Sequence, residues 1–407
     1  MWICTIFVSH MQDKVNMRNN MLKWLLYFIL IFSGGNATAN SLDSVEISLL
    51  TCSPGTAVYE QYGHTAIRCR FLKTNEDIVF NYGVFSFSEP HFIWRFIKGE
   101  CDYQIGVESF EDFCWQYDRR GSTVYQQVLN LTPHEKEKLL NALFENMRPE
   151  NRRYRYNFLY DNCTTRARDK IEKAIDGKVI YSQSRNKTYR KIIHQYTFDY
   201  PWTMLGIDIC LGEDADKIIT EREEMFAPLY MLKYADDAMI QSPDCTTRPF
   251  ILSKSEIVKG RPVVPEKTFP LSPLQVVWIV FGLVGILTIV ERRYGKCFWW
   301  LDAILLALQG GIGLVVAMLF FFSVHPTVDS NWLIIVFNPI PLLAMPWVVY
   351  SAIKHQRNVY HFVASVVLTL FIIFSALMPQ NFNAVVVPLV LILLLRSCNY
   401  VFIYLKR

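Results

Sequence analysis

Five long apolar runs in the C-terminal third constrain this chain more than any other feature. They lie at about 273–290, 300–323, 332–351, 360–378 and 384–404. A helix needs roughly 20 residues, at ~1.5 Å rise each, to cross a bilayer. The sequence therefore predicts an all-α membrane domain of about five transmembrane helices over residues 273–405. The third run contains Phe337-Asn338-Pro339-Ile340-Pro341, which a membrane helix tolerates only where neighbours satisfy the freed carbonyls.

The preceding residues 40–265 have the mixed, charged composition of one water-soluble globular domain, without internal repeats. The formal net charge of +4 is modest, and part of it lies beside the apolar runs. Nucleic-acid binding is therefore not expected.

Lys and Arg in the short connections predict the orientation. The basic connections, which should be cytoplasmic, contain Arg292, Arg293, Lys296, Lys354, Arg357, Lys406 and Arg407. The alternating connections 324–331 and 379–383 contain neither Lys nor Arg. The domain at 40–265 is therefore expected outside the cytoplasm and the C-terminus inside it.

The N-terminal segment gives an independent indication of export. Lys23 precedes the apolar run 24–32, and Ala37-Thr38-Ala39 follows as a cleavage signal. Residues 1–39 are thus predicted to be a signal peptide, with a possible later start at Met17 or Met21. An uncleaved anchor is the alternative, and it would also export the domain.

Apolar patterning predicts an α+β class for the exported domain. Strands are expected at 43–52, 64–71, 77–87 and 122–130, and helices at 108–118, 133–146 and 162–175. Residues 185–265 indicate short helices and loops of unassigned order.

Seven cysteines fall in this domain, which leaves at least one thiol free in an oxidising compartment. They are Cys52, Cys69, Cys101, Cys114, Cys163, Cys210 and Cys245. A free thiol is either a nucleophile or an inert buried residue, and the disulfide pairing stays open.

Cys163 lies at the predicted start of a helix, in Tyr160-Asp161-Asn162-Cys163-Thr164-Thr165. The unpaired amides there lower a thiol pKa, and the N–H of Cys163 itself can stabilise an oxyanion. Asp161 or Asn162 is expected to be the N-cap.

A thiolate nucleophile needs a base that later acts as an acid, and histidine suits this role. The exported domain offers His64, His91, His134 and His194. His64 is preferred because it follows Gly63 at the start of a strand, where a small neighbour permits close approach. The alternative is that the presence of one His and one Cys in these motifs is an accident of composition, without a catalytic role. No CxxC, HxxxH, phosphate loop or GxSxG motif occurs, so no metal or cofactor is expected.

At these residues the chain resembles the Lnb-type bacterial lipoprotein N-acyltransferase family. The resemblance rests on Ser53-Pro54-Gly55, Tyr59-Glu60-Gln61-Tyr62-Gly63-His64-Thr65-Ala66-Ile67-Arg68, Phe80-Asn81-Tyr82-Gly83 and Tyr156-Asn157-Phe158-Leu159-Tyr160-Asp161-Asn162-Cys163-Thr164-Thr165-Arg166. It continues through Pro201-Trp202, Ala227-Pro228 and the multi-span tail, and so covers nearly the whole chain in order.

The resemblance implies a circularly permuted papain-like cysteine domain, in which the histidine strand precedes the cysteine helix. Asn81 is then the candidate that orients the imidazole, with Glu60 and Asp161 as alternatives. Arg68 and Arg166 are candidates to bind a lipid phosphate, although surface ion pairs are the more ordinary use of such arginines.

The function that the resemblance implies is transfer of a fatty acyl chain, through a Cys163 thioester, from a membrane phospholipid to the α-amine of the diacylglyceryl-cysteine of a lipoprotein. The catalytic domain would be periplasmic and the protein a multi-pass protein of the inner membrane. One alternative is a papain-like cell-wall amidase or peptidase. Another is a non-catalytic envelope transporter or sensor. It is disfavoured because the spans are expected to contain almost no charge apart from Arg396, near the cytoplasmic end of the last span.

Overall fold

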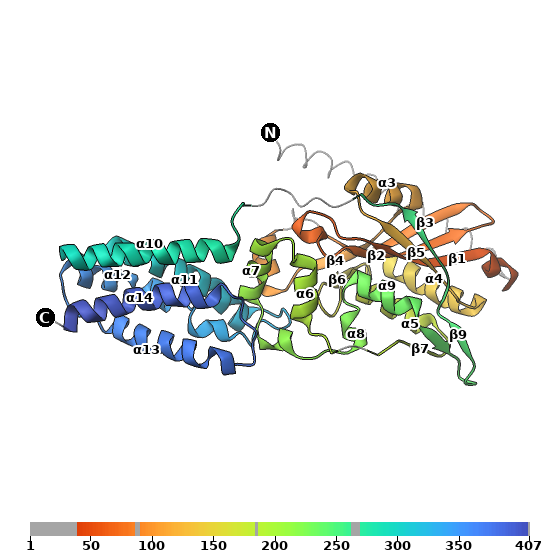
Figure 1. Cartoon of the computed structure of the whole chain (residues 1–407). Coiled ribbons are helices and arrows are strands. Elements are labelled where there is room, and N and C mark those ends of the chain that lie inside the picture. The colour runs from red at the N-terminus through yellow and green to blue at the C-terminus, as the bar shows by residue number, and fades with distance from the viewer. Residues whose placement is uncertain (1–38, 86–89, 184–185, 262–268, 406–407) are drawn as a thin grey trace. The chain divides into compact units, whose positions relative to one another are not determined.

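The computed structural model describes residues 39–85, 90–183, 186–261 and 269–405. The predicted signal peptide therefore lies, except for Ala39, outside the described residues. The chain forms two compact units, which we describe separately (Figure 1). The sheet unit comprises Met1–Phe92, Glu100–Lys187 and Ile219–Val264. The membrane unit comprises Ile93–Gly99, Thr188–Ile218 and Pro265–Arg407, and so takes two segments from within residues 40–265.

An antiparallel sheet is the centre of the sheet unit. Among the described residues it has seven strands in the order β10-β5-β1-β2-β3-β4-β6. The strands are β1 (Val45–Cys52), β2 (His64–Phe71), β3 (Glu76–Val84), β4 (Asp102–Ser109), β5 (Val124–Leu129), β6 (Arg153–Arg155) and β10 (Ile251–Val258). A small second sheet contains β7 (Lys178–Ile180), β8 (Met239–Gln241) and β9 (Thr247–Pro249).

Helices cover both faces of the main sheet (Figure 1). The helices of this unit are η1 (Ala39–Ser44), η2 (Val58–Glu60), α3 (Phe110–Arg120), α4 (Pro133–Met147), α5 (Cys163–Ala174), α8 (Glu221–Glu224) and α9 (Pro228–Asp236). On one face α4, α5 and α9 pack on side chains such as Leu49 and Ile67. On the other face α3 packs on Leu50 and Ala66. Both sides of β1 and β2 are therefore buried, which holds these strands rigidly.

Most expected elements of this unit are present within a few residues of their predicted bounds, and the sheet-rich domain followed by membrane helices is confirmed. Six strands were missed, namely β4, β6, β7, β8, β9 and β10. β4 precedes α3 directly, and the polar edge strand β10 is exposed along nearly its whole length. Without one buried face, β10 lacks the alternating pattern that identifies a strand. The permuted papain-like topology stays a prediction.

The membrane unit contains five candidate spans among the described residues, as predicted: Pro273–Tyr294, Trp299–Phe322, Trp332–Ile353, Val359–Leu377 and Val386–Ile403. They correspond to α10 (Pro273–Tyr294), α11 (Trp299–Phe322), η4 (Trp332–Ile335) with α12 (Ile340–Ile353), α13 (Val359–Phe374) with η5 (Ser375–Leu377), and α14 (Val386–Leu405).

The third span is interrupted between η4 and α12. The Asn338 side-chain amide donates to the carbonyls of Ile334 and Ile335 at 3.2 Å each, and Gln309 of α11 donates to Val336 at 2.8 Å. A Cβ on Gly313 would come within 2.3 Å of Asn338 backbone atoms. The side-chain amides of Asn338 and Gln309 thus satisfy backbone carbonyls at this break, and the glycine in α11 allows the two segments to approach closely.

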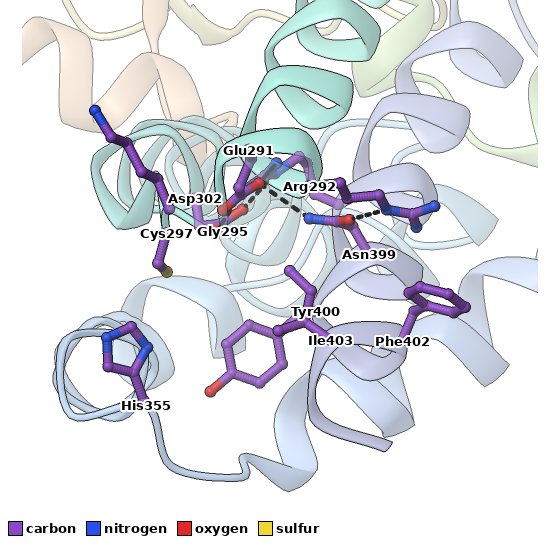
Figure 2. A pocket seen from close by; sticks show the side chains of 12 residues that line it. Glu291, Arg292, Gly295, Cys297, Asp302, His355, Asn399, Tyr400, Phe402 and Ile403 are labelled. Carbon is purple, nitrogen blue, oxygen red and sulfur yellow. Dashed lines mark hydrogen bonds and ion pairs between the residues drawn. The ribbon is translucent and has the colours of Figure 1, made fainter. Parts of the chain in front are cut away.

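A buried charge cluster joins α10, α11 and α14 (Figure 2). Arg396 pairs with Asp302 at 2.8 Å and with Glu291 at 2.5 Å, and donates to Thr288 at 3.0 Å. The expectation that the spans contain almost no charge apart from Arg396 overlooked Asp302 in α11 and Glu291 in α10. Pairing with these two carboxylates makes the burial of Arg396 tolerable. A cavity of about 230 Å³ adjoins the cluster, and none of the predicted site residues lines it.

The two segments 93–99 and 188–218 contribute α2 (Phe92–Lys98), α6 (Tyr189–Thr197), α7 (Pro201–Cys210) and η3 (Glu213–Asp216). The Gly212 N–H donates to the Thr327 carbonyl at 2.7 Å, and Asn383 donates to Asp208 at 2.8 Å. The connections 324–331 and 379–383, which lack Lys and Arg, therefore meet residues of the predicted exported region.

Candidate functional site

A tight turn before β2 positions His64. Gly63 has φ +78°, a conformation that favours glycine, and a Cβ there would lie 2.4 Å from the Cys52 carbonyl oxygen. His64 is the first residue of β2 and is paired in register with Cys52 of β1. The small residue expected before this histidine is thus required by the turn itself.

Asn162 is the N-cap of α5, which resolves the choice between Asp161 and Asn162. Its side-chain oxygen accepts from the N–H groups of Thr164 at 2.8 Å and Thr165 at 2.9 Å. Its amide donates to the carbonyls of Phe158 and Phe226, each at 2.8 Å. With a buried cap held from both sides, Cys163 is fixed as the first residue of the helix.

The start of α5 is docked on β2 and β3. The hydroxyl groups of Thr65 and Thr164 lie 3.0 Å apart, and the Thr65 backbone lowers the pKa of the Cys163 thiol. A Cβ on Gly83 would lie 3.5 Å from the Cys163 Cβ. The thiol therefore sits where the helix start meets the two central strands.

His64 and Cys163 each shift the pKa of the other. Burial raises the pKa of the Cys163 thiol, but the His64 charge, the His64 hydrogen bond and the contacts from Thr65 and Thr164 outweigh it, so the pKa is lowered. Burial lowers the pKa of His64, but the contributions of Cys163 and the hydrogen bond with Asn81 raise it by more, so the pKa of His64 is raised overall. Both directions favour a thiolate–imidazolium pair.

Asn81 of β3 contacts the other side of the imidazole. Its side-chain oxygen lies 2.9 Å from His64 Nε2, so Nδ1 is the ring nitrogen that Asn81 does not engage. The Asn81 amide donates to Glu108 of β4 at 2.5 Å. The expected neighbour of the histidine is thus present, and it is itself oriented by a carboxylate.

Glu108 is the one member of this chain of contacts that the sequence analysis missed. Burial raises its pKa to about 7, while nearby His64 opposes that rise. The sequence signal that could have identified it is a carboxylate in β4, the strand that follows the strand of Asn81. It went unnoticed because β4 was not predicted.

The two alternative orienting carboxylates contact arginines instead of His64. Glu60 lies 3.4 Å from Arg120, and Asp161 lies 2.6 Å from Arg166. Of the three candidates, Asn81 is the one whose side chain bonds His64 in the described structure.

The Arg68 guanidinium is bonded to side chains within the sheet unit. It forms a two-point ion pair with Asp77 at 2.8 and 2.5 Å, donates to Gln126 at 2.5 Å and lies 3.4 Å from the centre of the Phe110 ring. The side chain is only 7% exposed. A buried, satisfied guanidinium is not available to a lipid phosphate, so this geometry speaks against the role expected for Arg68.

Arg166 is more accessible and lies one helical turn after Cys163. It pairs with Asp161 and stacks 3.5 Å from the centre of the Tyr154 ring, with 23% of the side chain exposed. Residues three apart on a helix share a face. Arg166 thus flanks the thiol, although its partner Asp161 competes for it.

The remaining histidines considered lie elsewhere. His134 is 3.9 Å from Asp176, and His194 of the membrane unit bonds Asp208 at 2.8 Å. Over the described ranges, the cysteines are all free thiols, including Cys52, whose pKa burial raises.

Two protein-family models match this chain, in chain order. The model described as the Lnb N-terminal periplasmic domain matches residues 36–195, and the model described as the Lnb transmembrane domain matches residues 265–407. No curated protein and no solved structure gives a significant match. The first match contains His64, Asn81, Glu108 and Cys163, and the second contains the candidate spans.

Proposed function

The chain belongs to the Lnb family, and from this premise we propose that it is a lipoprotein N-acyltransferase. In this proposal a fatty acyl chain passes from a membrane phospholipid to Cys163, and from Cys163 to the α-amine of the diacylglyceryl-cysteine at the start of a lipoprotein. The proposal is supported by the placement of Cys163 at the start of α5 and of His64 against Asn81, and by the opposite pKa shifts that His64 and Cys163 cause in each other.

The first half-reaction starts from the Cys163 thiolate and the His64 imidazolium. The thiolate attacks the carbonyl carbon of a glycerol ester and forms the C–S bond. The developing oxyanion is stabilised by the N–H of Cys163, because the next two amides, of Thr164 and Thr165, already bond the cap. His64 then gives its proton to the glycerol oxygen, the C–O bond breaks, and lysophospholipid leaves a thioester and a neutral imidazole.

The second half-reaction restores the starting state. The amine of the lipoprotein attacks the thioester carbon while neutral His64 removes an amine proton. The C–S bond breaks, which gives the amide, the thiolate and the imidazolium again. Asn81 holds the imidazole in one orientation throughout, so that Nδ1 serves both proton transfers.

The membrane unit explains how such substrates reach one enzyme. Both the donor and the acceptor are anchored in a bilayer, and a catalytic unit on a multi-span anchor shares their surface. Confinement of all three to one membrane raises their effective concentration. We propose the inner membrane as the site, with the sheet unit in the periplasm and the C-terminus in the cytoplasm.

We also propose that Arg166 contacts the phosphate of the donor. It is partly exposed, one turn from Cys163, and its planar guanidinium suits bidentate phosphate binding. Asp161 would hold the group in place until a phosphate engages it.

The test is to trap the acyl-enzyme. Purified full-length protein is mixed with vesicles of phosphatidylethanolamine carrying a labelled acyl chain, without an acceptor. We expect label on the Cys163 peptide that hydroxylamine releases, as a thioester requires, and a hydroxylamine-resistant ester on Cys163→Ser. Release of peptidoglycan peptides without any phospholipid dependence would instead establish the amidase alternative.

A further inference from the structure

The short helix α2 exposes an unusually apolar surface. Its sequence is Phe-Ile-Trp-Arg-Phe-Ile-Lys, and Ile93, Trp94 and Phe96 are 75%, 51% and 51% exposed. Burying such a side chain away from water is favourable. Three of them together on a seven-residue helix therefore indicate a surface that is covered in the working protein.

The C-terminal end of α2 is fixed to the connection that leaves α11. The Val324 N–H donates to the Lys98 carbonyl at 2.9 Å, and His325 Nε2 donates to the Phe96 carbonyl at 2.6 Å. Gly99, at φ +73°, lies so close to His325 that a Cβ on Gly99 would be 3.0 Å from the His325 backbone nitrogen. All these residues belong to the membrane unit, so the depth of α2 is tied to the end of a candidate span.

That end of α11 is itself apolar and exposed. Phe321 and Phe322 are 66% and 62% exposed in its last turn. Val324 follows Phe322 by two residues, which reach at most ~7 Å of extended chain. The headgroup layer on each side of the hydrocarbon core is about 5–8 Å thick. α2 thus lies at the level of the lipid headgroups if α11 crosses the bilayer.

The composition of α2 fits this position. Tryptophan suits the boundary between hydrocarbon and water because its ring has an apolar body and a polar N–H, and phenylalanine supplies apolar contact there. Arg95 and Lys98 supply positive charge beside the phosphate layer, and their stems add apolar contact.

We propose that α2 is an interfacial helix that inserts Ile93, Trp94 and Phe96 into the headgroup region of the phospholipid leaflet on the exported side. The occupant of this surface is phospholipid. The inference depends on the multi-span anchor and not on the chemistry of Cys163.

The test uses full-length protein in nanodiscs of phosphatidylethanolamine and phosphatidylglycerol, with a lipid that carries a photoactivatable group near its glycerol. Adducts are mapped by peptide mass spectrometry. We expect residues 93–98 to be labelled at a level similar to Phe321 and Phe322, and several-fold above Leu252, a 63% exposed leucine on β10. Labelling of α2 no higher than that of Leu252 would overturn the proposal.

A matched pair of variants sharpens the result. In Ile93→Ser/Trp94→Ser the α2 adducts should fall several-fold while those at Phe321 persist, and Leu252→Ser should leave both unchanged. The wild-type pattern decides the question even if a variant fails to fold. Cross-linking of residues 93–98 in native membranes to a protein, in place of lipid, would also contradict the assignment.

Discussion

His64 Nε2 lies 2.9 Å from the side-chain oxygen of Asn81, so Asn81 engages one ring nitrogen and leaves Nδ1 for another partner. Asn81 in turn donates to Glu108, so three neighbouring strands, β2, β3 and β4, hold the base against the start of α5. The orientation of His64 is therefore a property of the rigid sheet and not of a surface loop.

The paired pKa shifts predict how the reactivity of Cys163 depends on pH. A lowered thiol pKa keeps the thiolate, the form that alkylates, present at pH values below the usual thiol range. In His64→Ala the lowering contributions of His64 are lost while burial remains, so the midpoint should move to higher pH. Iodoacetamide labelling followed on the Cys163 peptide measures this, with exposed Cys245 as the internal control. An unchanged midpoint in His64→Ala would refute the pairing.

Transfer activity should show a bell-shaped pH profile. Its acid limb follows loss of the thiolate, and its alkaline limb lies at the raised pKa of His64, above which the imidazolium cannot protonate the leaving oxygen. The control is His64→Ala, in which residual activity should lose the alkaline limb. A profile that rises continuously with pH would contradict the acid role of His64.

Asn81 and Glu108 should act through His64. Asn81→Ala removes a hydrogen bond worth ~1 kcal/mol, so kcat should fall roughly fivefold to tenfold with KM little changed. Glu108 has a pKa raised to about 7, and its ionisation favours the imidazolium. Glu108→Gln should therefore lower the pKa of His64, which NMR titration measures. If that pKa does not move, Glu108 has no positioning role.

Gly63 should be intolerant of any side chain. Gly63→Ala places a residue at φ +78° with its Cβ 2.4 Å from a carbonyl oxygen, a strain of ~1–3 kcal/mol or more. We expect a lower thermal midpoint in detergent and reduced activity, because the turn carries His64. The matched control is Gly206→Ala in α7, where nothing lies within 4 Å of the new Cβ and stability should hold or rise.

Substitution of Arg68 should reduce stability, whereas substitution of Arg166 should weaken phospholipid binding. Arg68→Met leaves Asp77 and Gln126 without their donor and should cost ~1–3 kcal/mol of stability, with the KM for phospholipid unchanged. Arg166→Met should raise that KM instead. Thermal unfolding and vesicle assays of both variants check this. A raised KM for Arg68→Met in folded protein would restore its expected role in phosphate binding.

Local signals predicted much of the candidate site. The glycine before His64 and the polar cap before Cys163 are short-range requirements of a turn and of a helix start, and both are visible in sequence. Glu108 was missed because β4 runs directly into α3 and only the helix was recognised. The pairing of Arg68 with Asp77 was not foreseen because it depends on how β2 and β3 align, and sequence spacing does not reveal that.

The membrane spans were predictable from length and hydropathy, whereas their internal chemistry was not. Asp302 and Glu291 lie in different helices from Arg396, so only packing shows that they neutralise it. Likewise, the break near Asn338 was expected, but its repair by Gln309 required the neighbouring helix.

Mass spectrometry of lipoprotein N-termini tests the central claim most directly. Cells that contain this protein as their sole N-acyltransferase are compared with cells that contain Cys163→Ser or, as a matched control, Cys245→Ser. We predict triacylated N-termini for the wild-type protein and for Cys245→Ser, and diacylated N-termini with a free α-amine for Cys163→Ser. Retention of the third acyl chain in Cys163→Ser would contradict the account.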